Sequence, residues 1–176
     1  MSVATATMGA VTVGSLSVDM EALLDQLNEV AEFEQFAADV YRATAELLPE
    51  QAMRVKAREF WTGAEEGRQA AIGLMRLIGG EPLAARETVA SFLGQARGAL
   101  SAGRSGRFGT LKNLQDMLVA AFLSAGAWTI VQGAAYGIGD PRLIQVAERE
   151  VGQKSLPVQW LLQTIAERSS WAVLKS

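Results

Sequence analysis

The chain has 176 residues, of which 49% are hydrophobic and 20% charged, so it is long and apolar enough for one domain with a packed core. Its net charge of −3 gives no electrostatic basis for binding nucleic acid or an anionic membrane. It contains neither cysteine nor histidine, which excludes disulfides, thiolate or imidazole metal ligands and serine–histidine catalytic triads.

The N-terminal segment, residues 1–17, has no charged side chain and is rich in small and β-branched residues. It lacks the basic start and the apolar core of a secretory signal, and we expect no stretch of the chain to be long enough to span a bilayer. We therefore expect a cytoplasmic protein with a flexible tail over residues 1–17 and one helical domain over residues 18–176.

The tail contains the run Thr12-Val13-Gly14-Ser15-Leu16. This run resembles the short targeting peptide that docks cargo proteins onto the inner wall of encapsulin shells. That peptide is usually C-terminal and is often followed by a basic residue, whereas here it is N-terminal and Ser17 follows it. The resemblance implies an encapsulin shell as a partner, and the alternative is an ordinary flexible tail.

Two long helices are predicted in the first half of the chain. The first covers about residues 19–48, with Ser17 or Asp19 as its N-cap, and Pro49 ends it. The second covers about residues 50–78 and ends at a Gly-Gly pair. Because a very short turn joins them, we expect an antiparallel helical hairpin.

A glutamate interrupts the apolar stripe of the first helix. On a 3.6-residue period, Leu27, Ala37 and Tyr41 lie on one face, and Glu34 stands in the middle of it. A carboxylate on a buried stripe is unfavourable unless it is paired, protonated or bound to a metal. We therefore expect the other helices to supply a partner for Glu34.

The second half of the chain predicts another hairpin. A connector over residues 81–109 contains a short helix, and a third long helix covers about residues 110–136. The fourth begins at Asp140-Pro141, a cap followed by a proline in the first turn, and Pro157 is expected to kink it or restart it. These elements predict an all-α, up-down antiparallel four-helix bundle with a long connector between the second and third long helices.

Each of three predicted long helices carries a short motif. The first helix carries Glu34, Ala37 and Tyr41, and the second carries Ala64, Glu66 and Gln69. The fourth carries Asp140, Pro141, Leu143, Val146, Glu150 and Gln153. Their order resembles the ferritin-like superfamily, which includes the rubrerythrin-type proteins. The resemblance implies a dinuclear iron or manganese centre held by one Glu from each of two helices and by Glu-x-x-His from each of the other two.

The chain departs from that pattern at the metal ligands. Gln69 and Gln153 stand at the two histidine positions, and a neutral amide is a poor ligand for Fe or Mn. If Trp128 is the aromatic residue of the third motif helix, Ala121 replaces its glutamate. The carboxylates left for a metal are at most three, Glu34, Glu66 and Glu150.

We therefore expect a vestigial site with no cofactor, in which Gln69 and Gln153 hydrogen-bond to Glu34 and Glu150. The corresponding function is that of a ferritin-like protein that has lost its dinuclear centre and acts as a binding, scaffolding or encapsulated-cargo protein. One alternative is a di-metal oxidoreductase or ferroxidase with a histidine-free site for Fe or Mn.

A second alternative is a metal-free enzyme that uses the apolar interior of the bundle. Glu34 or Glu150 would then be the general acid or base, and the pocket would be lined by Tyr41, Trp61 and Trp128.

Apolar residues also flank the main stripes, and the mean hydropathy is +0.15. Helices buried on more than one face predict a homodimer or a larger assembly. The flanking residues are Phe33, Phe36, Trp61, Ile72 and Leu77.

Overall fold

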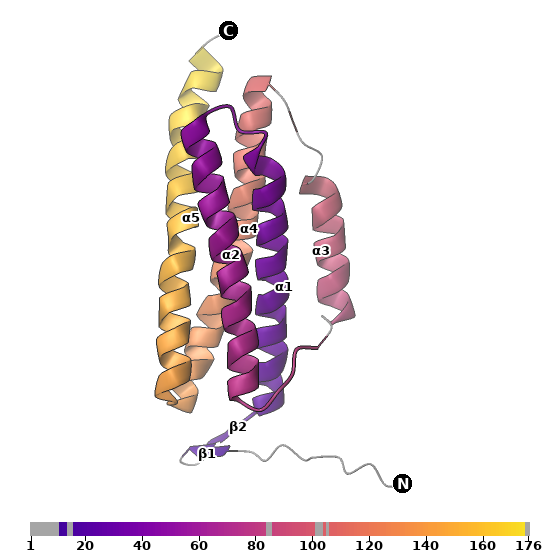
Figure 1. Ribbon diagram of the computed structural model, residues 1–176, viewed down its shortest axis with the longest axis vertical. Helices are drawn as coiled ribbons and strands as arrows, with labels where there is room; N and C mark the ends of the chain where they lie inside the picture. The colour runs from indigo at the N-terminus through magenta and orange to yellow at the C-terminus, as the bar shows by residue number, and fades with distance from the viewer. Residues whose placement is uncertain (1–10, 14–15, 84–85, 101–103, 105, 175–176) are drawn as a thin grey trace.

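The computed structural model describes residues 11–13, 16–83, 86–100, 104 and 106–174. Within these residues the helices are α1 (Met20–Ala45), α2 (Gln51–Leu77), α3 (Glu87–Leu100), α4 (Gly106–Ile138) and α5 (Pro141–Leu174), and the strands are β1 (Val11–Val13) and β2 (Leu16–Val18). The four long helices form a bundle, and the shorter α3 lies along the outer side of α1 (Figure 1).

The long helices are arranged as two antiparallel hairpins, α1–α2 and α4–α5 (Figure 1). The connector that contains α3 carries the chain back along the bundle, so α4 begins at the same end as α2. α1 packs extensively against α2 and α4, and α4 packs against α5, whereas α2 and α5 touch little. The predicted all-α bundle with a long connector is confirmed, and its α2–α5 seam is loosely packed.

Local signals set the helix ends close to the predicted positions. Asp19 is the N-cap of α1, and its side chain accepts a hydrogen bond of 3.0 Å from the backbone N–H of Ala22. Gly79 follows α2 with a φ of +81°, a left-handed conformation that glycine adopts without strain. The amide of Gly80 then donates to the carbonyl of Met75, which closes the last turn.

α5 continues through Pro157 to Leu174, so of the two predicted outcomes, a kink or a restart, the restart is wrong. A proline inside a helix has no N–H for the carbonyl four residues earlier, here that of Gln153, and costs about 3 kcal/mol. Buried residues hold α5 in the bundle on both sides of the proline, with Leu143 and Ala147 before it and Leu161 after it. This packing offsets the unfavourable local conformation.

The core consists of two apolar clusters along the bundle. One contains Phe36, Met117 and Leu161, and the other contains Leu27 and Trp128. On α1, Glu34 lies between the residues that belong to the two clusters. The interruption of the apolar stripe is therefore also the boundary between the two halves of the core.

α3 is attached to α1 by a few specific contacts. Leu93 is buried against the core, and Arg97 lies 3.5 Å from Asp39 of α1. Just before α3, the backbone N–H of Leu83 donates a 2.9 Å hydrogen bond to Asn28 Oδ1. These contacts guide the connector along α1 and keep it away from the α2–α5 seam.

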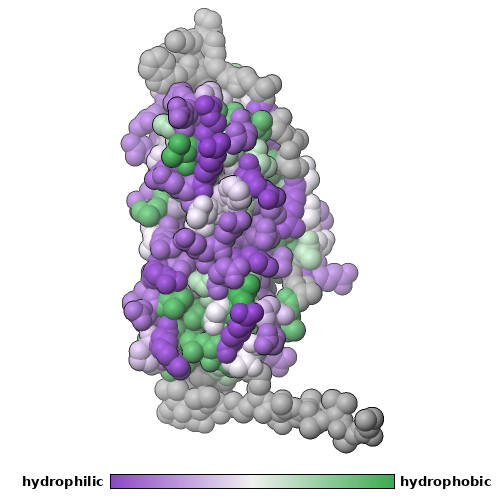
Figure 2. All heavy atoms as spheres, in the orientation of Figure 1, coloured by the Kyte–Doolittle hydropathy of each residue, from purple (hydrophilic) through white to green (hydrophobic). Residues whose placement is uncertain are grey.

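α4 is apolar on its outer side as well as its inner side. Its exposed large hydrophobic residues are Phe108, Val119, Phe122, Ile130 and Tyr136. By contrast, the face over α1, α2 and α5 is mostly hydrophilic (Figure 2).

By length and composition, Phe108–Ile138 in α4 could cross a membrane, so the expectation that no stretch is long enough was wrong. Core helices of soluble proteins meet the same criterion, and α4 packs between α1 and α5 in this bundle.

The strands β1 and β2 form a short antiparallel pair before α1. Val11 lies opposite Val18, Thr12 opposite Ser17, and Val13 opposite Leu16. The predicted targeting peptide falls in this region, but its Gly14 and Ser15 lie outside the described residues.

Candidate functional site

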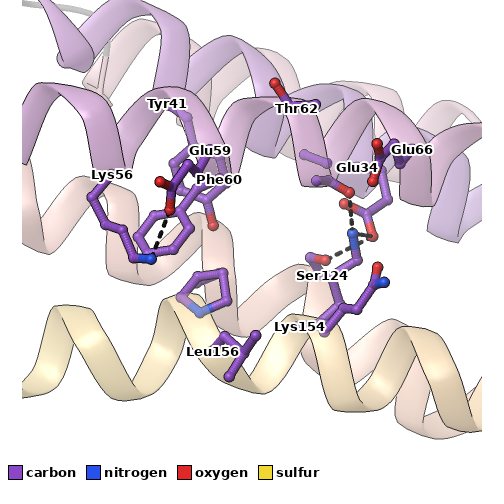
Figure 3. A pocket seen from close by; sticks show the side chains of 15 residues that line it. Glu34, Tyr41, Lys56, Glu59, Phe60, Thr62, Glu66, Ser124, Lys154 and Leu156 are labelled. Atoms are coloured by element: carbon purple, nitrogen blue, oxygen red, sulfur yellow. Dashed lines mark hydrogen bonds and ion pairs between the residues drawn. The ribbon is translucent and has the colours of Figure 1, made fainter.

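Glu34 of α1 is fully buried and accepts three hydrogen bonds on a single carboxylate oxygen, Oε1. Two come from α4, from Ser124 Oγ at 2.9 Å and from the indole N–H of Trp128 at 2.6 Å. The third comes from α5, where Lys154 Nζ lies 2.9 Å away (Figure 3). The partner that the sequence led us to expect for Glu34 is therefore a buried ammonium group, supported by two neutral donors.

The Lys154 ammonium lies between two buried carboxylates. Its Nζ also donates to the carbonyl of Gly63 at 2.6 Å and lies 3.8 Å from Glu150 Oε2. Glu150 is 1% exposed, and its other oxygen pairs at 2.7 Å with Arg149, whose side chain is 56% exposed. Glu34, Glu150 and Lys154 together are called the core ion cluster below.

Gly67 of α2 makes room for this cluster. A Cβ at this position would collide with Lys154 Nζ and lie 2.5 Å from Glu34 Oε1. Because both atoms are buried and paired, neither is free to move away. α2 can therefore pass this close to the ion pair only with a glycine here.

Burial dominates the electrostatics of Glu34. It raises the pKa of the Glu34 carboxyl above the ordinary value, while the charge of Lys154 and the hydrogen bonds from Lys154, Trp128 and Ser124 oppose the rise. Among the described residues, Oε2 of Glu34 and Oε2 of Glu150 are buried without a hydrogen-bond partner. Each carboxylate thus has one oxygen in use and one that can still accept.

A pocket of about 440 Å³ opens onto the core ion cluster between α2 and α5. Glu34, Ser124 and Lys154 lie toward one end of it, and the ion pair of Lys56 and Glu59 lies toward the other (Figure 3). The walls between these ends are largely apolar and include Tyr41, Phe60, Ala64, Ala121, Leu156 and Pro157.

The two glutamines are not partners of the buried carboxylates. Gln69 and Gln153 are exposed, and in the part of the chain that the structure describes neither amide hydrogen-bonds to Glu34 or Glu150. The reason is the orientation of α5 about its own axis, which places residue 154 and not residue 153 toward the core. Glu66 is exposed for the same reason, because α2 turns Gly67 inward.

The three aromatic residues proposed for a pocket have different positions. Tyr41 lines the pocket, and burial together with the charge of Glu34 raises the pKa of its hydroxyl. Trp128 is buried as a donor to Glu34, and Trp61 lies under the guanidinium of Arg42 at 5.9 Å from its ring centroid. Neither tryptophan lines this pocket.

Sequence reasoning missed Lys154 although a signal for it exists. Lys154 stands four residues after Glu150, so both fall on the same face of α5. That face is the buried stripe of the helix: Leu143, Ala147, Glu150, Lys154, Pro157 and Leu161. A lysine on such a buried stripe requires an anionic partner, just as Glu34 requires a cationic one, because an unpaired buried charge is unfavourable.

The residues of the cluster do not fit a dinuclear metal centre. Within the described ranges, no group of three or more Asp, Glu, His or Cys side chains is placed to hold a metal ion. The core ion cluster itself holds only two carboxylates, Glu34 and Glu150, and the Lys154 ammonium would repel a divalent cation beside them. The chemistry of this donor set is that of an internal ion pair.

Comparisons with known proteins identify the fold. Neither a protein-family model nor a curated protein matches the chain. Among solved structures, a ferritin-like, diiron-carboxylate protein from Bacillus anthracis str. Ames is similar with a TM-score of 0.64 and 14% identity, covering 85% of this chain and 99% of that one. A bacterioferritin-related protein from Bacteroides fragilis, a dodecameric thioferritin, has a TM-score of 0.55 and 22% identity, covering 90% of this chain and 94% of that one.

The chain therefore has a ferritin-like fold, and the predicted resemblance is confirmed at the level of fold. Within this fold, the chain carries a lysine and two buried glutamates at the centre of its bundle.

The space at Gly67 gives a first prediction. Gly67→Ala should destabilise the protein, although alanine favours a helix, because its methyl group must displace the Glu34–Lys154 pair. Gly73→Ala is the matched control on the same helix, since a Cβ there meets nothing, and it should stabilise by about 1 kcal/mol. Urea unfolding of both variants measures the difference, and a Gly67→Ala variant as stable as Gly73→Ala would contradict the close approach.

The raised pKa of Glu34 gives a prediction with a definite sign. The folded protein holds this proton more tightly than the unfolded chain, so ionisation of Glu34 removes stability as the pH rises from 4.5 through the raised pKa. Glu34→Gln cannot ionise, so its free energy of unfolding relative to wild type should increase over this range. Each tenfold difference in acid dissociation constant between the two states contributes about 1.4 kcal/mol.

Unfolding curves of wild type and Glu34→Gln at pH 4.5 and pH 8 measure this change. Glu65→Gln, at an exposed position of α2, is the control and should show no comparable trend. A relative stability of Glu34→Gln that falls between pH 4.5 and pH 8 would contradict the prediction.

Proposed function

We propose that this chain is a metal-independent ferritin-like protein in which the core ion cluster replaces a dinuclear centre, and that it acts as a binding protein. The supporting observation is the Lys154 ammonium at 2.9 Å from Glu34 inside the bundle. A built-in cation neutralises the buried carboxylate, so the bundle needs no metal ion to hold it.

The pocket beside the cluster supports a binding role. Its volume of about 440 Å³ and its apolar walls with a few polar groups at one end are typical of small-molecule sites. A scaffolding or encapsulated-cargo role is compatible with this proposal, the latter through the run Thr12–Leu16. A metal-free enzyme is the second candidate, because Glu34 lines the pocket and its pKa is raised.

The proposal predicts metal content. Protein purified from culture supplemented with Fe and Mn should contain less than one equivalent of Fe, Mn or Zn per chain by elemental analysis. Two equivalents of iron, with an oxo-to-iron absorption band after exposure to oxygen, would overturn it.

Lys154 should then supply the positive charge that balances Glu34 in the core. Lys154→Met leaves Glu34 without its charge partner, and should lower the free energy of unfolding at pH 8 by about 3–5 kcal/mol. Lys56→Met is the matched control, because the Lys56–Glu59 pair is exposed and should contribute less than about 1 kcal/mol. Equal stabilities of the two variants would contradict this role of Lys154.

We also propose that the chain forms a homodimer or a larger assembly through the outer side of α4. A solved structure with the same fold is a dodecamer. In this chain, Phe122 and Ile130 are more than half exposed on the same side of α4, at 52% and 57%. A second copy would remove this apolar surface from water.

The test is the molar mass in solution, measured by size-exclusion chromatography with light scattering. Wild type should be at least dimeric, and Phe122→Glu should shift it toward the monomer. Val55→Glu introduces the same charge at an exposed apolar position of α2 and should leave the assembly unchanged. A monomeric wild type would contradict the proposal.

A further inference from the structure

The end of the pocket that meets the core ion cluster has more hydrogen-bond acceptors than donors. Glu34 Oε2 is fully buried and has no partner among the described residues, and Glu34 lines the pocket. On the backbone, Pro157 has no N–H for the carbonyl of Gln153, so this carbonyl lacks its usual helical donor. Gln153 and Pro157 both line the pocket and lie on one side of α5.

The donors that contact Glu34 are already engaged, and neither the Thr62 hydroxyl nor the Gln153 amide, which also line the pocket, donates to Glu34 Oε2. Ser124 Oγ and Trp128 Nε1 donate to Glu34 Oε1, and Lys154 Nζ donates to the same oxygen and to the carbonyl of Gly63. A ligand that fills this end of the pocket can therefore satisfy Glu34 Oε2 only with a donor of its own.

The net charge at this end of the pocket is negative. The core ion cluster has two carboxylates and one ammonium, and a further cation, Arg149, pairs with Glu150 Oε1 from a half-exposed position. In the pocket lining, Lys56 and Glu59 pair with each other at 2.7 Å, which leaves Glu34 and Glu66 against Lys154. The balance at the Glu34 end is one negative charge.

From these observations we propose that the pocket binds a small primary amine in its protonated form, with the ammonium group on Glu34 Oε2 and an apolar body along the walls toward Phe60 and Leu156. The ammonium group brings N–H donors for Glu34 Oε2 and for the Gln153 carbonyl, and it supplies the missing positive charge. The apolar body covers the wall between the two charged ends of the pocket. This inference rests on the proposed binding role and names the class of ligand.

Three molecules of similar shape test the proposal: benzylamine, benzyl alcohol and benzoate. Their dissociation constants are measured by isothermal titration calorimetry on the full chain at pH 7.5, where benzylamine is protonated. Benzylamine should bind at least about tenfold more tightly than benzyl alcohol, because its hydrogen bond to a carboxylate is charge-assisted. Benzoate should show no saturable binding.

Variants then locate the bound amine. Gly63→Leu adds a side chain at a pocket-lining position where a Cβ meets no heavy atom within 4 Å, so it should fill the pocket without disturbing α2. It should weaken benzylamine binding at least about tenfold. Gly73→Leu makes the same change at an exposed position of α2 away from the pocket and should leave the dissociation constant unchanged.

Glu34→Gln should likewise weaken benzylamine, and Glu65→Gln should not. The proposal is overturned if benzyl alcohol or benzoate binds as tightly as the amine, if Gly63→Leu leaves amine binding unchanged, or if no amine binding is measured. Metal content distinguishes a wrong ligand class from a wrong proposed function. If the protein holds less than one equivalent of metal per chain and binds no amine, only the proposed ligand class is contradicted.

Discussion

The ion pair between Glu34 and Lys154 is the interaction on which the arrangement of this bundle depends. A buried carboxylate or a buried ammonium alone would destabilise the core by several kcal/mol, so each requires the other at hydrogen-bond distance. All four long helices contribute to this pair. α1 supplies Glu34, α5 supplies Lys154, and α4 supplies the donors Ser124 and Trp128. α2 supplies the carbonyl of Gly63 and the space at Gly67. A shift of one residue along any of these helices would break the pair.

Buried ion pairs contribute more to the specificity of a fold than to its net stability, because desolvation offsets much of their attraction. Stability in this chain comes from the two apolar clusters on either side of Glu34. Small residues such as Ala37, Ala121 and Ala127 are frequent in those clusters, and they allow many alternative ways of sliding one helix against another. The ion pair selects one register among these alternatives.

Much of the fold could be predicted from local signals, because helix ends depend on residues a few positions apart. Asp19 and the Gly-Gly pair at 79–80 are examples, and the apolar stripe of α1 correctly indicated that Glu34 is buried and paired. The identity of the partner was predicted wrongly, because Gln69 and Gln153 were expected and the charged partner is Lys154. Residues 153 and 154 differ by about 100° around the helix, so a small error in the assumed face exchanges a glutamine for a lysine.

Gln153 occupies a ligand position of the motif that resembles the ferritin-like pattern, whereas the hydrophobic stripe of α5 itself favours Lys154. At Pro157 the possible restart was predicted from the local preference of proline to end a helix, and packing on both sides of it outweighs that preference. The unused acceptor oxygens and the pocket depend on how four helices meet, and no sequence spacing encodes them.

The loosely packed seam between α2 and α5 determines how the molecule can move. The two hairpins are joined along α1 and α4, and the connector runs over the outer side of α1, so nothing covalent crosses the seam in the described residues. Polar contacts span it, from Lys154 to the Gly63 carbonyl and from Arg168 to Glu50. The α1–α4 contact therefore has the geometry of a hinge, and a rotation of a few degrees about it would widen the seam while leaving both hairpins intact. Such breathing would wet the bundle interior from one side only, at the position of its charged groups.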